Sequence, residues 1–192
     1  MSERRVAITA ELARKTGIDD QMIEHLVFTF YGKVRADTML GPIFEERIED
    51  WPRHLDRMYA FWSSVALMTG RYHGQPMQKH QPLPIDGRHF DHWLSMFEET
   101  ATEECPPAAA AHFIQKARGI AESLELGVAS HLGVRLKTSE RLLRPDDDVH
   151  LAMADPTVPP DGEFSSPACA MPEVDPGAAK APKNRREPPA RD

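Results

Sequence analysis

Hydrophobic residues in the first two thirds of the chain recur with the period of an α-helix. In the clearest segment they are offset by 0, 3, 4, 7, 8 and 11 residues, at Ile23, Leu26, Val27, Phe30, Tyr31 and Val34. Side chains at these offsets lie on one face of a helix. Asp19 and Asp20 precede the pattern, and aspartate is a good capping residue. The pattern therefore predicts an amphipathic helix that begins near residue 20 and ends near residue 37.

The same spacing predicts further helices along the chain. After Gly41-Pro42, a short helical segment is expected over residues 43–48, and Asp50 can cap a longer helix that Gly70 closes. Two more helices are expected over residues 88–103 and 107–130. No segment alternates with the two-residue period of a strand. The predicted fold class is therefore all-α, with four substantial helices.

The segment between Gly70 and Gly87 differs from the rest of this region. It contains Gly74, Pro76, Pro82 and Pro84, which leave room for at most one helical turn, over residues 76–80. Irregular segments held between rigid elements often carry binding residues. We therefore expect chemistry in this loop.

Composition divides the chain into a core-forming part and a tail. All three Trp, all three Tyr and seven of the eight Phe precede residue 115, whereas ten of the 17 Pro follow residue 135. A segment with so few apolar residues cannot offset the entropy of ordering itself. We therefore predict an N-terminal extension over 1–18, one helical domain over 19–132 and a disordered Pro-rich tail over 133–192.

Charge and motifs narrow the range of functions. The net charge of -7 argues against a general nucleic-acid partner, and no apolar stretch reaches the roughly 18 residues of a membrane helix. With no secretory signal pattern and two distant cysteines, Cys105 and Cys169, we expect a cytoplasmic protein without membrane contacts. The sequence also lacks a phosphate-binding loop, a Gly-x-Gly-x-x-Gly motif, a His-Glu-x-x-His zinc helix and a Glu-x-x-His di-iron motif.

Four residues with polar tips lie on or beside apolar helix faces: Tyr31, His54, His80 and Trp93. A buried polar group without a partner costs roughly 1 to 3 kcal/mol, and a bound polar ligand is one possible partner. Taken singly, each residue is better explained as an ordinary core or surface residue than as a binding residue. Spacing alone leaves that choice open.

Six segments resemble those of group III truncated haemoglobins, in the family's order and at its distances. They are Phe30-Tyr31-Gly32-Lys33-Val34, Leu40-Gly41-Pro42-Ile43-Phe44, Trp51-Pro52-Arg53-His54, Phe61-Trp62, Tyr72-His73-Gly74-Gln75-Pro76-Met77-Gln78-Lys79-His80 and Phe90-Asp91-His92-Trp93-Leu94. The absence of a Gly-Gly pair fits this subgroup. The resemblance covers residues 20–130 and implies the truncated globin fold, a two-over-two helical sandwich around a haem.

The resemblance also assigns roles to individual residues. It implies that His80 is the proximal ligand of the haem iron, and that Tyr31, His54 and Trp93 line the distal pocket where a diatomic ligand binds. Contacts with the haem are expected from Phe44, Met58, Phe61, Trp62, Tyr72, Met77 and Phe90, with Phe97 as a further candidate; plain core roles are equally open for them. Arg71, Tyr72 and Lys79 are candidates to meet the propionates. Because no Cys-x-x-Cys-His motif occurs, the cofactor is expected to be non-covalent haem b.

The function implied by the resemblance is the binding of dioxygen or a related diatomic ligand such as NO or CO, for transport or sensing. Detoxification of nitric oxide or peroxide is also open. It would need a reductase in trans, because the sequence has no flavin or nicotinamide motif. The alternative is a cofactor-free helical interaction module whose Pro-rich tail recruits partners.

Overall fold

The computed structural model describes residues 3–138 and 140–145, and this part of the chain is all-α, as predicted, with no strand. Its helices are α1 (Glu3–Thr16), α2 (Asp20–Ala36), α3 (Gly41–Arg47), α4 (Trp51–Leu67), α5 (Pro76–His80), α6 (Gly87–Glu104) and α7 (Pro107–His131). None of them is long and apolar enough to span a membrane. The described residues lie within the first of two compact units, residues 1–160.

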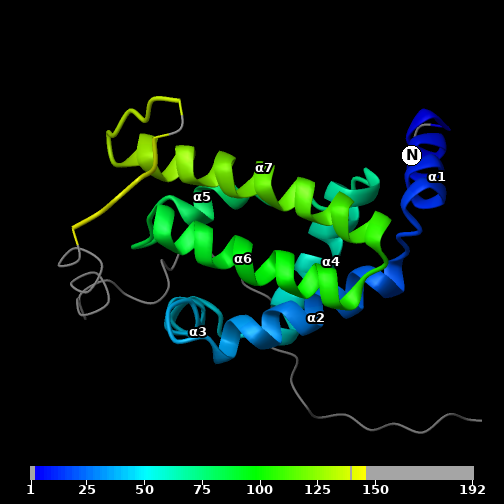
Figure 1. The fold of residues 1–192 in the computed structure, drawn as a ribbon, viewed down its shortest axis with the longest axis horizontal. Coiled ribbons are helices and arrows are strands. Elements are labelled where there is room, and N and C mark those ends of the chain that lie inside the picture. Colours follow the sequence, from blue (N-terminus) through cyan, green and yellow to red (C-terminus); the bar gives the residue numbers. More distant parts are fainter. Residues whose placement is uncertain (1–2, 139, 146–192) are drawn as a thin grey trace, which may run out of the picture. The chain divides into compact units, whose positions relative to one another are not determined.

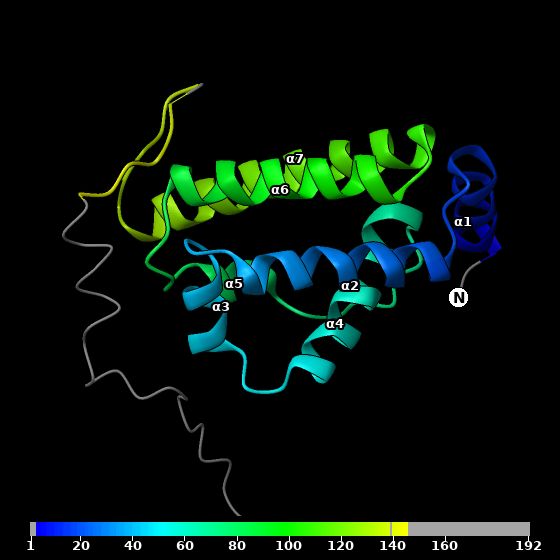
Figure 2. The ribbon, with the colours of Figure 1, turned by 60° about the horizontal axis from the view of Figure 1, so that its bottom comes forward.

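The four long helices α2, α4, α6 and α7 form two layers. Figure 2 shows α6 and α7 side by side in one layer, with α2 and α4 in the other. Contacts between α2 and α6, and between α4 and α7, join the layers, and the short helix α5 packs on α7 (Figure 1). This arrangement is the expected two-over-two sandwich.

One aromatic residue from each long helix meets at the centre of the main core. Phe30, Trp62, Phe97 and Phe113 are each at most 1% exposed. Trp62 stacks on Phe97 with ring centroids 4.6 Å apart, and the edges of Phe30 and Phe113 pack against this pair. Burying an aromatic side chain stabilises a fold by roughly 1.5 to 3 kcal/mol, so these rings hold the two layers together.

The observed helix ends match the capping residues with one exception. The Asp19 side chain accepts a hydrogen bond from the Met22 N–H at 2.8 Å, and Asp50 accepts one from the Arg53 N–H at 3.0 Å. At its other end α4 was expected to continue to Gly70. It stops at Leu67 instead, because Met68 takes the left-handed conformation with φ of 57° and so turns the chain.

The expected extension over residues 1–18 forms α1, a helix that the hydrophobic pattern did not predict. It packs on α4 and α7, and the Thr9 hydroxyl donates a hydrogen bond to the Leu67 carbonyl at 2.8 Å. Apart from Thr16 no residue of α1 is fully buried, which explains why its apolar periodicity is weak. The first part of the chain is therefore attached to the end of α4.

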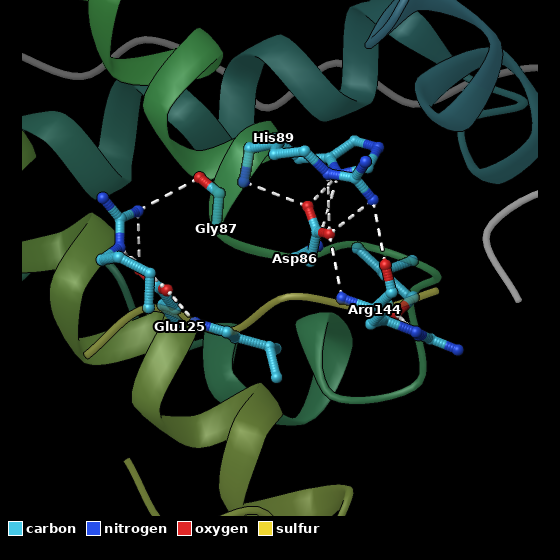
Figure 3. A network of polar contacts seen from close by, with 9 residues as sticks. Asp86, Gly87, His89, Glu125 and Arg144 are labelled. Carbon is cyan, nitrogen blue, oxygen red and sulfur yellow. Dashed lines mark hydrogen bonds and ion pairs between the residues drawn. The ribbon is translucent and has the colours of Figure 1, made fainter. Parts of the chain in front are cut away.

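A second departure lies beyond α7, in residues 140–145, which we call the C-terminal strap. Leu142 is only 2% exposed, and its carbonyl accepts a hydrogen bond from the Gly87 N–H at 2.7 Å. Arg141 pairs with Glu125 of α7 at 2.8 Å (Figure 3). Packing therefore extends to residue 144, past the expected boundary at residue 132. The rest of the predicted tail, residues 146–192, lies outside the described residues.

Candidate haem-binding site

His80 ends α5 with its imidazole in the state required of a metal ligand. Its Nδ1 donates a hydrogen bond to the Pro76 carbonyl at 2.7 Å, and a carbonyl can only accept. The proton is thereby fixed on Nδ1, and the lone pair lies on Nε2. Burial lowers the pKa of His80, although the bond to Pro76 acts in the opposite direction. A neutral imidazole with a free Nε2 is the usual axial ligand of a haem that binds diatomic molecules.

Tyr31 and His54 meet on α2 and α4, as the sequence predicted, with ring centroids 5.3 Å apart. Tyr31 is 6% exposed, and burial raises the pKa of its phenol, so the hydroxyl keeps its proton and can donate. Burial, together with the charges of Arg57 and His80, lowers the pKa of His54 to about 4.

Trp93, the third predicted distal residue, is separated from Tyr31 by the ring of Phe30. Its indole stacks on Phe97 with centroids 5.4 Å apart, and Phe30 lies between it and Tyr31, with edge contacts to both rings. Phe44 of α3 packs its edge against Tyr31 at 5.9 Å. The structure therefore brings Tyr31, His54 and Phe44 into direct contact and connects Trp93 to them through the core.

A cleft of about 610 Å³ lies between α4, α5 and α7, within the range of sites that hold a small molecule or cofactor. Two predicted haem contacts line it, Phe61 and Met77, whereas His54 and His80 do not. A third, Tyr72, packs against Phe61 at 5.1 Å and donates its backbone N–H to the Ser64 hydroxyl at 2.8 Å. The cleft thus adjoins the helix that carries His80.

The remaining predicted contacts have other neighbours. Trp62 is enclosed in the main core, Met58 packs against that core, and Phe90 belongs to a second cluster with Ile43 and Ile85. Among the propionate candidates, Arg71 forms a bidentate salt bridge with Asp20, with N–O distances of 2.8 and 3.0 Å. Lys79 is exposed. Haem contacts from these residues stay predictions.

Two buried side-chain nitrogens in the described part of the chain lack a hydrogen-bond partner: His54 Nε2 and Trp51 Nε1. Both lie in the first turn of α4, next to Tyr31. Leaving such atoms unpaired costs roughly 1 to 3 kcal/mol each, which a polar ligand would offset. Unpaired polar atoms of this kind fit a pocket that holds a small polar ligand. Sequence reasoning missed Trp51, although it lies three residues before His54 and so on the same helix face.

A buried carboxylate holds the loop that follows His80. Asp86 is fully buried and accepts hydrogen bonds from the Arg88 N–H and Nε, both at 3.0 Å, and from the Arg144 N–H of the strap at 3.2 Å (Figure 3). The Arg144 guanidinium also reaches the Leu83 carbonyl at 3.4 Å. The strap and α6 therefore fix residues 83–86, directly after the helix that carries His80.

Replacing Asp86 by Asn should lower the free energy of unfolding at pH 7 by about 2 to 3 kcal/mol, because charge-assisted hydrogen bonds are lost while the cap is kept. Burial tends to raise the pKa of Asp86, but hydrogen bonds from Arg88 and His89 outweigh it and hold the pKa at about 2. An unfolded Asp titrates near 4, so this stabilisation is complete above about pH 4 and disappears as the pH falls through 2.

Urea unfolding at a series of pH values measures both effects of the Asp86 change. The difference between wild type and variant should shrink between pH 4 and pH 2. Asp20→Asn is the control, because its pair with Arg71 is exposed and should contribute less than about 1 kcal/mol. Equal losses in the two variants would show that the buried network has no special role.

Comparisons with known proteins identify the family of the chain. Residues 14–120 match the model of the bacterial-like globin family. The chain is 41% identical over 88 residues to the group 3 truncated hemoglobin ctb of Campylobacter jejuni, which covers 43% of this chain and 69% of the relative. It is 29% identical over 84 residues to the group 2 truncated hemoglobin YjbI of Bacillus subtilis, covering 43% of this chain and 64% of that protein.

The fold comparison leads to the same subgroup. The crystal structure of the group III truncated hemoglobin from Campylobacter jejuni matches with a TM-score of 0.54 and 35% identity, over 56% of this chain and 89% of that one. The family match spans more than half of this chain, and the resemblance noted in the sequence is confirmed. The chain therefore belongs to the bacterial-like globins and, among them, to the group III truncated haemoglobins.

Proposed function

We propose that this globin binds haem b through His80 alone and reversibly binds dioxygen or a related diatomic ligand, NO or CO, beside Tyr31, His54 and Trp93. The observation that carries the proposal is the pairing of His80 Nδ1 with the Pro76 carbonyl, which leaves Nε2 as the ligating atom. The hydroxyl of Tyr31 and the unpaired Nε2 of His54 are the polar groups proposed to bond to the diatomic ligand.

Attachment of the haem should be non-covalent. Cys105 is buried, and burial raises the pKa of its thiol to about 11, so it is a poor nucleophile. Cys169 lies outside the described residues, and neither cysteine belongs to a Cys-x-x-Cys-His motif. Retention of the haem therefore depends on His80 and on apolar contacts such as those of Phe61 and Met77.

The distal residues act on the ligand through hydrogen bonds. A bound haem would supply an iron that His80 holds and that can bind a diatomic ligand. The Tyr31 hydroxyl keeps its proton at neutral pH and can donate it to a ligand atom that carries partial negative charge. His54 is neutral at pH 7, because its pKa is about 4, so it too can donate without bringing a charge into the pocket. These donors should slow ligand release.

The proposal is tested by the visible spectrum and by oxygen release. The purified chain should show an intense Soret band, and Tyr31→Phe should release dioxygen at least about tenfold faster, because one strong hydrogen bond is lost. Stopped-flow mixing measures the rate. Tyr59→Phe is the control, since this tyrosine lies five residues after His54 on α4 and so on a different face of the helix. A colourless protein would favour the cofactor-free interaction module instead.

A further inference from the structure

The polar atoms around His54 include one that the proposed function leaves unused, the indole N–H of Trp51. Trp51 Nε1 and His54 Nε2 are the two buried side-chain N or O atoms without a hydrogen-bond partner in the part of the chain that the structure describes. The two rings are neighbours, with centroids 5.7 Å apart at an angle of 75°. Both also contact the Tyr31 ring, at 6.4 Å from Trp51 and 5.3 Å from His54. Three polar rings therefore meet at one place.

The chemistry of these groups restricts what can satisfy them. An indole N–H can only donate, whereas a neutral imidazole nitrogen donates or accepts according to its tautomer. A small molecule that accepts from Trp51 and also bonds to His54 would satisfy both atoms at once. A water molecule or a diatomic ligand has the necessary size and polarity.

The indole of Trp51 also has a cation–π contact with Arg35. The guanidinium carbon of Arg35 lies 4.5 Å from the centroid of the Trp51 ring, and Arg35 Nε bonds to Glu45 Oε1 at 3.1 Å. Residues of α2, α3 and α4 thus restrict the rotation of the ring. A donor that is already fixed in place loses little entropy when it forms a hydrogen bond, so a fixed donor is more effective than a mobile one.

We infer that Trp51 is a fourth polar residue of the distal pocket, whose indole N–H donates a hydrogen bond to the water or diatomic ligand next to His54. The inference rests on the proposed haem function. It assigns Trp51 a role in ligand specificity: the donor favours ligands with a partly negative outer atom, such as dioxygen, over the less polar carbon monoxide. Arg35 is a positioning residue that acts through Trp51.

Trp51→Phe in the full-length holoprotein tests the inference, because phenylalanine keeps an aromatic ring but has no N–H donor. Dioxygen release should become about fivefold faster, as expected for one hydrogen bond, while carbon monoxide release changes less. The infrared stretching band of the carbon monoxide complex should move to higher frequency. An unchanged Soret band and melting temperature would show that the variant still folds and holds haem.

Two further measurements separate a contact with the ligand from a purely structural role. The indole ¹⁵N–¹H resonance of Trp51, identified by its absence in Trp51→Phe, should shift between the carbon monoxide complex and the dioxygen complex, both of which are diamagnetic. Arg35→Met should broaden the carbon monoxide band, because the indole is less restrained. If Trp51 instead bonds only to His54, Trp51→Phe will have no effect in a His54→Leu background, and the inference is overturned.

The outcome also distinguishes this inference from the proposed function. Should Trp51→Phe match wild type in its release rates and infrared band while Tyr31→Phe still accelerates dioxygen release, the role of Trp51 is refuted and the proposed function stands. A wild-type chain without a Soret band refutes both.

Discussion

Replacing His80 by Gly should reduce haem affinity by more than about 100-fold, because the iron loses its protein ligand. The purified variant should lack the five-coordinate ferrous spectrum and the carbon monoxide complex derived from it. Haem transfer to apomyoglobin measures the loss as a rate. Adding free imidazole to His80→Gly should restore the spectrum in part, since the small ligand can enter the space left by the side chain.

His73→Gly is the matched control for the His80 change. This histidine is exposed and lies in the same loop, seven residues earlier. Its replacement should leave the spectrum unchanged. The assignment of His80 is wrong if His80→Gly still forms the same five-coordinate complex, or if removal of His54 abolishes haem binding instead.

Arg141→Met should lower the free energy of unfolding by about 2 to 4 kcal/mol, because it leaves the carboxylate of Glu125 buried without its cation. The Glu125 side chain is 7% exposed and lies 2.8 Å from Arg141. The loss should stay below that for a fully buried pair, since the Arg141 side chain is 42% exposed and already partly hydrated. Urea unfolding of the full-length holoprotein measures it.

The chain offers a closely matched control for the Arg141 change. Arg118 pairs with Glu98 at 2.7 Å, but both side chains are more exposed, at 63% and 30%. Arg118→Met should therefore cost less than about 1 kcal/mol. Adding Glu125→Gln to Arg141→Met should recover part of the loss, because the unpaired charge is removed. Equal effects of Arg141→Met and Arg118→Met would show that the strap is dispensable for stability.

Periodicity predicted those elements whose stability comes from a buried face. The α2 pattern was read correctly because the six residues that define it all enter the core, and α5 was limited to one turn by the prolines around it. Periodicity also placed Tyr31 and His54 each on a buried helix face, whereas their meeting in one pocket was implied by the resemblance. Their chemical roles came from resemblance, because spacing alone does not distinguish a core histidine from a ligand.

The features that were missed depend on contacts between distant segments. The strap has no helical pattern, and its place is determined by Arg141 and Leu142, which meet residues of α6 and α7. α1 buries too little apolar surface to produce a clear period. Trp51 looked like a core residue, because a sequence does not reveal that a buried N–H lacks a partner. The strap, α1 and the unpaired N–H of Trp51 can each be recognised only in the three-dimensional structure.

Because α5 is short, the position of His80 depends on the residues that pack against this helix. Isolated helices below about 12 residues are marginal in water, so a five-residue helix takes its position from its neighbours. Met77 reaches α7 at Gly127, where a β-carbon would collide with its sulfur. A larger side chain at position 127 would push the flexible end of Met77 aside, and Met77 lies on the same single helical turn as His80. Such a change would act on the His80 side of the site and leave Tyr31 and His54, on α2 and α4, in place.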